Sequence, residues 1–192
     1  MSPRSKAQFE ELREASKEKI LEAALQLFGT KGYDTTSISD IVREAGVSKG
    51  LMYHYFESKE DLLRKMIDNL VGQADDAMSL AIHEDPRATM KDILTMFFAE
   101  MKAHLQQWRL IMNLTLQIDR YDFVHRLAIT KIDGYVSLFE ELLGKMGWPN
   151  PKDEAKLLTA LFDGVGLQYF ILKEDYDLDE MERILLQKYC SP

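Results

Sequence analysis

Residues 37–56 have the sequence SISDIVREAGVSKGLMYHYF, which predicts two short helices joined by a tight turn. Ser37 and Ser48 are each placed to cap a helix N-terminus, and Ser37 with Asp40 has the spacing of a capping box. Gly46 ends the first helix, because glycine adopts the left-handed backbone conformation at little cost. Apolar residues recur toward the inside of both helices. We therefore expect a helix-turn-helix whose second helix leaves its outer face free.

The sequence before this pair predicts a third helix in the same domain. Apolar residues at positions 20, 24, 27 and 28 have the spacing of one helical face and indicate a helix over roughly 10–31. Further apolar stripes predict long helices through the rest of the chain, and the few prolines leave room for them. We expect an all-α protein of about nine helices. Its parts are an N-terminal three-helix helix-turn-helix domain, 1–58, and a C-terminal helical domain, 59–192.

Composition is that of a globular protein, with 192 residues of which 46% are hydrophobic and 29% charged. No apolar run approaches the ~20 residues of a membrane-spanning helix, and the N-terminal sequence has no apolar stretch typical of a signal peptide. The single cysteine, Cys190, excludes an intrachain disulfide and a cysteine-based zinc site. We expect a cytoplasmic protein.

The net charge of −8 counts against nucleic-acid binding, which usually needs a basic surface. Its distribution changes this conclusion. Residues 1–60 contain nine Lys or Arg and ten Asp or Glu, whereas residues 61–192 contain fifteen and twenty-two. The acidity therefore lies in the C-terminal two-thirds, and an N-terminal DNA-binding face remains electrostatically possible.

The segments 32–41, 45–56 and 58–62 closely resemble the N-terminal domain of the TetR-like (tetracycline-repressor family) transcriptional regulators. The resemblance is unbroken from about Ile20 to Leu62, a quarter of the chain. Val42 stands where the family often has alanine, and Ser39 stands where a charged residue is common. The serine at position 39 removes one phosphate contact at most. The resemblance implies a dimeric, ligand-responsive DNA-binding regulator. The C-terminal part is similar only in architecture, so no particular ligand is implied.

The resemblance also implies roles for individual residues. The recognition helix begins at Ser48, where Lys49 can donate to guanine and Gly50 allows close approach of the backbone. Tyrosine hydroxyls and Lys59 are expected at phosphates. The predicted DNA-binding residues are Thr36, Ser48, Lys49, Gly50, Leu51, Tyr53, His54, Tyr55 and Lys59.

Some of these assignments have alternatives. Core packing is the alternative for Tyr53 and Tyr55, and the preferred interpretation for Phe56. His54 is as consistent with a solvated surface position as with a DNA contact. Basic residues before the motif either contact DNA or belong to a solvated terminus; they are Arg4, Lys6, Arg13 and Lys17.

Aromatic and methionine side chains in the C-terminal helices predict a cavity for a small apolar or aromatic effector. Ordinary core packing is the alternative for each of them taken singly. The predicted effector-binding residues are Phe97, Met101, His104, Trp108, Met112, Tyr135, Phe139, Phe162 and Tyr169.

A helix over about 152–173 carries two adjacent apolar lines, which imply two packing partners. One line can serve the subunit's own core and the other a second copy of the chain. The alternative is a monomer in which both lines are covered internally. The predicted dimer-interface residues are Leu157, Leu161, Gly164, Gln168, Ile171, Met181, Ile184 and Leu185.

An enzyme would need a constellation that this sequence lacks. No Glu-x-x-His pair, G-x-S-x-G, P-loop or Rossmann glycine pattern occurs. We expect no catalysis, no metal and no cofactor.

The predicted function is a repressor that binds a palindromic double-stranded operator as a homodimer, away from membranes. The alternative is a helical protein-interaction module that does not bind DNA.

Overall fold

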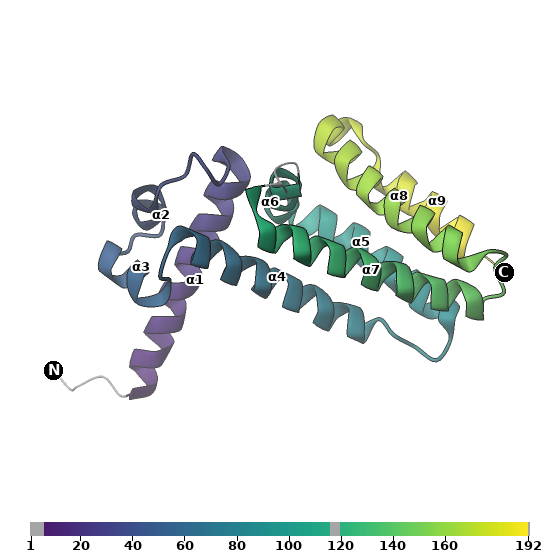
Figure 1. Ribbon diagram of the computed structural model, residues 1–192, viewed down its shortest axis with the longest axis horizontal. Helices are drawn as coiled ribbons and strands as arrows, with labels where there is room; N and C mark the ends of the chain where they lie inside the picture. The colour runs from purple at the N-terminus through teal and green to yellow at the C-terminus, as the bar shows by residue number, and fades with distance from the viewer. Residues whose placement is uncertain (1–5, 116–119, 192) are drawn as a thin grey trace. The chain divides into compact units, whose positions relative to one another are not determined.

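The computed structural model describes residues 6–115 and 120–191, which form nine α-helices and no strand (Figure 1). The all-α prediction is thereby confirmed. The helices are α1 (Lys6–Lys31), α2 (Ile38–Glu44), α3 (Lys49–Tyr55), α4 (Lys59–Leu80), α5 (Pro86–Ala103), α6 (Leu105–Thr115), α7 (Asp122–Lys145), α8 (Pro151–Leu172) and α9 (Leu178–Cys190), with the 3-10 helix η2 (Lys173–Asp175) between α8 and α9.

The chain divides into two compact units, Met1–Ala74 and Asp75–Pro192. The division falls inside α4 rather than at its first residue, where the sequence places the domain boundary. In the first half of α4, Leu62, Leu63 and Met66 are buried. These side chains give the start of α4 an apolar face within the N-terminal unit.

The N-terminal unit is built on α1, α2 and α3. Ile20 and Phe28 from α1 and Ile41 from α2 are fully buried, together with Met52 from α3. Between α2 and α3, Gly46 has a φ of +65°, which a residue with a Cβ rarely adopts. The turn therefore depends on this glycine, and the buried side chains fix the angle between the two helices.

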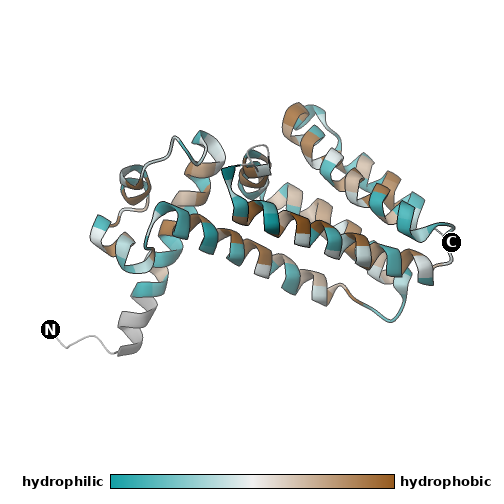
Figure 2. Cartoon of the chain, in the orientation of Figure 1, coloured by the Kyte–Doolittle hydropathy of each residue, from teal (hydrophilic) through white to brown (hydrophobic). Residues whose placement is uncertain are grey.

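The C-terminal unit packs α7 against α8 and α5 against α9. Polar and apolar residues alternate along these helices (Figure 2), as expected for helices that bury one face. Phe98, Phe139, Leu158 and Tyr189 are among its fully buried side chains. This unit therefore has a hydrophobic core of its own.

Polar contacts fix α9 within this unit. The Tyr189 hydroxyl donates to Glu154 Oε1 of α8 at 2.8 Å, and Lys188 Nζ donates to the same oxygen at 2.5 Å. The Lys188 ammonium, with the Tyr189 hydroxyl, lowers the pKa of Glu154. The Lys102 ammonium of α5 contacts Asp179 at 2.5 Å. These bonds connect α9 to both α8 and α5.

One helical stretch among the described residues, Pro151–Asp175, is long and apolar enough to cross a membrane by length and composition alone. The core helix of a soluble protein passes the same test. Ala155, Leu158 and Val165 on this helix are buried within the C-terminal unit. This single helix does not indicate a membrane protein.

Candidate nucleic-acid interface

The second helix of the helix-turn-helix, α3, has a fixed inner face and a free outer face. The Ser48 hydroxyl caps α3 by accepting a 3.1 Å hydrogen bond from the Leu51 amide. Met52 and the adjoining Phe56 are fully buried, which confirms the core interpretation of Phe56. On the outside, three side chains and a glycine are exposed: Lys49, Gly50, Tyr53 and His54. Leu51 is half-buried.

The first helix of the pair, α2, begins with the predicted capping box. The Asp40 amide donates to the Ser37 hydroxyl at 3.1 Å, and the Ser37 amide donates to Asp40 Oδ2 at 3.1 Å. The Ser37 hydroxyl also donates to Asp40 Oδ2 at 2.7 Å. The hydroxyl and the amide of Ser37, together with Arg43, donate hydrogen bonds to the carboxylate and lower the pKa of Asp40 to about 2. The Asp40 carboxylate therefore helps to fix the N-terminus of α2.

Lys59 contacts backbone groups within its own unit. Its Nζ donates to the carbonyl oxygens of Tyr33 at 2.8 Å and Thr36 at 3.0 Å. The half-buried ammonium also lies 4.2 Å from the centre of the Tyr33 ring. These contacts connect the first residue of α4 to the turn between α1 and α2. The predicted phosphate contact of Lys59 stays a prediction.

The structure contradicts the predicted phosphate contact of the Thr36 side chain, which is only 1% exposed. Its hydroxyl is directed inward at the Gly32 carbonyl at 2.8 Å, with the Leu27 carbonyl at 3.4 Å. The physical reason is that Thr36 closes the turn after α1, where a threonine hydroxyl can replace a missing backbone donor.

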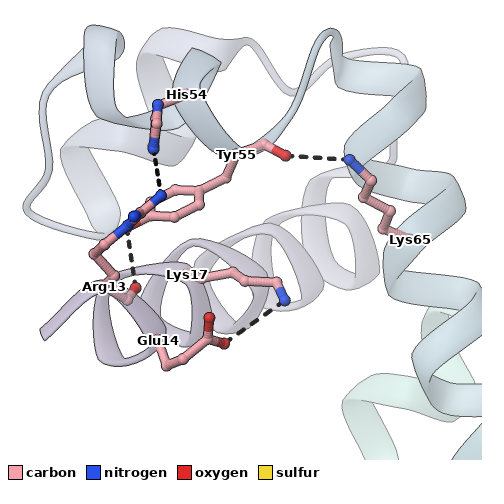
Figure 3. Close-up of a pocket in the computed structure, with 6 residues that line it drawn as sticks. All are labelled: Arg13, Glu14, Lys17, His54, Tyr55 and Lys65. Carbon is pink, nitrogen blue, oxygen red and sulfur yellow. Dashed lines mark hydrogen bonds and ion pairs between the residues drawn. The ribbon is translucent and has the colours of Figure 1, made fainter. Parts of the chain in front are cut away.

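Tyr55 is half-buried, and its hydroxyl donates to the Arg13 carbonyl oxygen at 3.1 Å. The hydroxyl proton is therefore not available to a phosphate, contrary to the predicted role of Tyr55 as a donor. The Arg13 guanidinium donates to His54 Nε2 at 2.7 Å (Figure 3). Lys65 donates to the Tyr55 carbonyl oxygen at 3.1 Å. These contacts connect α1, α3 and α4.

The sequence interpretation missed the contribution of Lys65 to this region. Its i, i+4 spacing from Asp61 was the available signal, and the two side chains form an ion pair of 2.8 Å. Of the four basic residues considered before the motif, Arg13 and Lys17 lie near α3, and the side chains of Arg4 and Lys6 lie outside the described residues.

Several of the predicted effector-binding residues meet in the C-terminal unit. The Phe97 ring lies 4.4 Å from that of Phe162 and 5.5 Å from that of Trp108, and Phe139 lies 5.5 Å from Phe162, between ring centres. We call these four residues the aromatic cluster. They come from α5, α6, α7 and α8. Such packing is consistent with both an effector site and an ordinary core.

The other predicted effector-binding residues surround this region to different degrees. Met101 is fully buried, Met112 is half-buried, and burial raises the pKa of the Tyr135 hydroxyl. The Tyr169 ring packs on Tyr176 with their centres 6.4 Å apart. His104 lies at the C-terminal end of α5, exposed, 3.4 Å from Glu100. These side chains differ in their access to solvent.

The outer face of α8 is apolar and exposed. Leu157, Leu161 and Ile171 are 59%, 41% and 63% exposed. Gln168 is exposed on the same helix and Gly164 is half-buried. These residues lie outside the core of the subunit, and their assignment to a dimer interface stays a prediction.

On α9, the predicted interface residues divide between two faces. Ile184 is 41% exposed and Met181 is half-buried. Leu185 is only 3% exposed, which contradicts its assignment to the dimer interface. The reason is the helical period: Leu178, Leu185 and Tyr189 share the face of α9 that packs into the core.

The family model for bacterial regulatory proteins of the tetR family matches residues 20–66, which contain α2, α3 and the start of α4. Residues 20–66 are TetR-like. The chain is 42% identical over 78 residues to an uncharacterised helix-turn-helix regulator, YvdT, of Bacillus subtilis. That match covers 40% of this chain and 40% of YvdT.

Two further similarities extend beyond the N-terminal region. The helix-turn-helix transcriptional regulator BetI of Proteus mirabilis is 27% identical over 183 residues, 88% of this chain and 86% of BetI. The crystal structure of a transcriptional regulator from Saccharomonospora viridis, in complex with choline, has a TM-score of 0.78 at 22% identity. That alignment covers 90% of this chain and 95% of the other. At this identity, the similarity shows that the chain shares the fold of the S. viridis protein over most of its length.

Proposed function

We propose that this TetR-like chain is a ligand-responsive transcriptional regulator that binds a palindromic double-stranded operator as a homodimer. The outer face of α3 carries the proposal, because Lys49, Tyr53 and His54 are exposed while Met52 holds the inner face. Lys49 would donate to guanine in the major groove, and Tyr53 would contact phosphate. Lys59 would contact a second phosphate.

Selection from random duplex DNA tests this proposal. A homodimer with one α3 in each half-site should enrich an inverted repeat, with half-site centres about one helical turn (~34–36 Å) or a multiple apart. Failure to enrich any sequence at low salt would overturn the proposal. The acidic C-terminal residues make a protein-interaction module without DNA binding the second candidate, and that result would favour it.

For the effector, we propose a small apolar or aromatic molecule held at the aromatic cluster. The contacts between Phe97, Trp108 and Phe162 support this position, because ligand sites are lined mostly by apolar and aromatic side chains. The choline complex of the S. viridis protein suggests choline as a further probe, since aromatic rings attract quaternary ammonium groups.

A thermal-shift screen with a hydrophobic library and choline tests the effector site. A hit should raise the unfolding temperature of the wild type and quench or shift its tryptophan fluorescence, to which Trp108 and Trp148 both contribute. The response should be lost in Phe162→Ala and retained in Tyr176→Phe, which removes only the hydroxyl of a ring that packs on Tyr169. Absence of any hit would favour the core-packing interpretation.

Effector binding would act through α4, because α4 runs across the division between the two compact units. We propose that residues 1–58 bind DNA, that residues 59–192 bind effector and form the dimer, and that effector binding releases the operator. For this regulatory role we propose a cytoplasmic location and no enzyme activity.

A further inference from the structure

The N-terminal unit contains a pocket of about 440 Å³ lined by charged and polar side chains. Its walls come from α1, the C-terminal end of α3 and the second turn of α4 (Figure 3). This volume lies within the ~300–1,000 Å³ of small-molecule sites. The lining residues are Arg13, Glu14, Lys17, His54, Tyr55 and Lys65.

The charge of this lining is opposite to that of the chain. Arg13, Lys17 and Lys65 supply three cations, Glu14 supplies one carboxylate, and Asp61 pairs with Lys65, which leaves one net positive charge without counting His54. The whole chain has a net charge of −8. A concave surface lined by one sign of charge concentrates counter-ions of the other sign. The pocket is therefore suited to an anion.

The geometry also provides hydrogen-bond donors. The Arg13 guanidinium uses Nη2 for His54 at 2.7 Å, a contact that fixes the orientation of a group with five N–H donors. Lys17 Nζ lies 3.7 Å from Glu14, and such an exposed pair contributes little free energy. Lys65 Nζ is held by Asp61 at 2.8 Å and the Tyr55 carbonyl at 3.1 Å. Donors from two helices thus line one concave surface.

We propose that this pocket binds a phosphate group. Guanidinium and ammonium groups form charge-assisted hydrogen bonds with phosphate oxygens, and the planar guanidinium can supply two in parallel. The phosphate belongs either to the backbone of bound DNA or to a free phosphorylated molecule. Only the first source rests on the proposed DNA-binding function. In both cases the bound anion connects α1 to α3, the helix that carries Lys49.

Two titrations of the full-length protein test the proposal and separate the sources. Inorganic phosphate and pyrophosphate are titrated calorimetrically in the absence of DNA. A random-sequence duplex is titrated over a series of salt concentrations. The variants are Lys17→Gln, which removes a cation from the pocket, and Glu14→Gln, which removes the opposing carboxylate. Lys19→Gln is the matched control, because Lys19 is an exposed residue of α1 outside the lining.

Lys17→Gln should weaken phosphate binding about tenfold, the loss of one charge-assisted hydrogen bond. Glu14→Gln should tighten binding, and Lys19→Gln should change it less than twofold. If the bound phosphate belongs to a free molecule, calorimetry with phosphate and pyrophosphate shows this order of affinities among the variants. If the source is DNA, the duplex shows it, and Lys17→Gln flattens the slope of log affinity against log salt by about 0.9. Unfolding temperatures of the variants verify that each is folded.

Equal behaviour of Lys17→Gln and Lys19→Gln in both titrations would overturn the phosphate site. The outcome is independent of the operator proposal. If the variants bind pyrophosphate with the expected order of affinities but no DNA sequence is enriched, the phosphate site is supported and the proposed DNA-binding function is not. If an inverted repeat is enriched but Lys17→Gln behaves like Lys19→Gln, the DNA-binding function is supported and the phosphate site is not.

Discussion

The Lys59 ammonium donates a 2.8 Å hydrogen bond to the carbonyl oxygen of Tyr33 and also lies 4.2 Å from the centre of the Tyr33 ring. The same lysine donates to the Thr36 carbonyl at 3.0 Å. Thr36 directly precedes Ser37, the N-cap of α2. Lys59 therefore stabilises the entry into the helix-turn-helix in addition to any contact with DNA.

Lys59→Met should lower the free energy of unfolding by about 1–3 kcal/mol, because hydrogen bonds to charged groups contribute about that much and their carbonyl acceptors lose a partner. It should also weaken binding to all DNA sequences alike. Urea denaturation and duplex titration measure the two effects. Lys59→Arg, which keeps the charge, should retain more of both. Unchanged unfolding in Lys59→Met would show that these contacts do not stabilise the fold.

Lys49→Ala is expected to change the specificity of DNA binding and to leave the stability of the protein unchanged. Lys49 is exposed at the start of α3, so its loss should leave the urea midpoint unchanged. Operator binding should weaken by about 1–3 kcal/mol, with relaxed preference at one base position. Anisotropy titrations against the operator and single-base variants measure this. Equal weakening on operator and random DNA would place Lys49 at a phosphate instead.

The local signals in the sequence predicted the helix-turn-helix well. Ser37 with Asp40, Ser48 and Gly46 act within a few residues along the chain, and each has the predicted capping or turn geometry. Such interactions need no knowledge of the tertiary structure. The N-terminal limits of the helices and the division inside α4 depend on packing between distant residues, which periodicity alone does not specify.

The incorrect site predictions share one cause. The Thr36 hydroxyl is directed at carbonyls four and nine residues upstream, Tyr55 bonds to one 42 residues away, and Leu185 packs into a core made by other helices. Whether a polar or apolar side chain faces solvent is a tertiary property. The Arg13 to His54 contact, 41 residues apart, escaped prediction for the same reason. The family resemblance indicated which positions could contact DNA, and the structure shows which of these side chains are exposed.

The capping box predicts a pH dependence of stability. The pKa of Asp40 is lowered to about 2, mainly by its bonds with Ser37. A carboxyl with a depressed pKa stabilises the fold above its ordinary value near 4, and this contribution is lost as the pH falls toward 2. The stability advantage of wild type over Asp40→Asn should therefore be complete at pH 7 and shrink below pH 4.

Urea midpoints at pH 7, 5, 4 and 3 measure this difference. Glu44→Gln is the control, because Glu44 is an exposed carboxylate on the same helix outside the capping box. An Asp40→Asn variant whose deficit stays constant from pH 7 to pH 3 would contradict a role for the ionised carboxylate.

The last prediction concerns the exposed face of α8. Leu157, Leu161 and Ile171 form an apolar row with large exposed fractions, and Ile184 on α9 is exposed as well. A row of this kind is typical of a surface that a partner covers. A second copy of the chain would supply the same face across a twofold axis, and an obligate homodimer of this type buries ~2,000 Å² or more.

Leu161→Asp should therefore give monomers that keep their helical content, because the residue lies outside the subunit's own core at 41% exposure. Operator binding should be lost, since a monomer contacts one half-site only. Leu158→Asp is the contrasting variant: Leu158 is fully buried three residues earlier on α8, so a charge there should unfold the C-terminal unit. Sedimentation velocity, circular dichroism and operator titration separate these outcomes. Wild-type protein that sediments as a monomer at micromolar concentration would refute the homodimer, and a Leu161→Asp variant that remains dimeric would place the interface on another face.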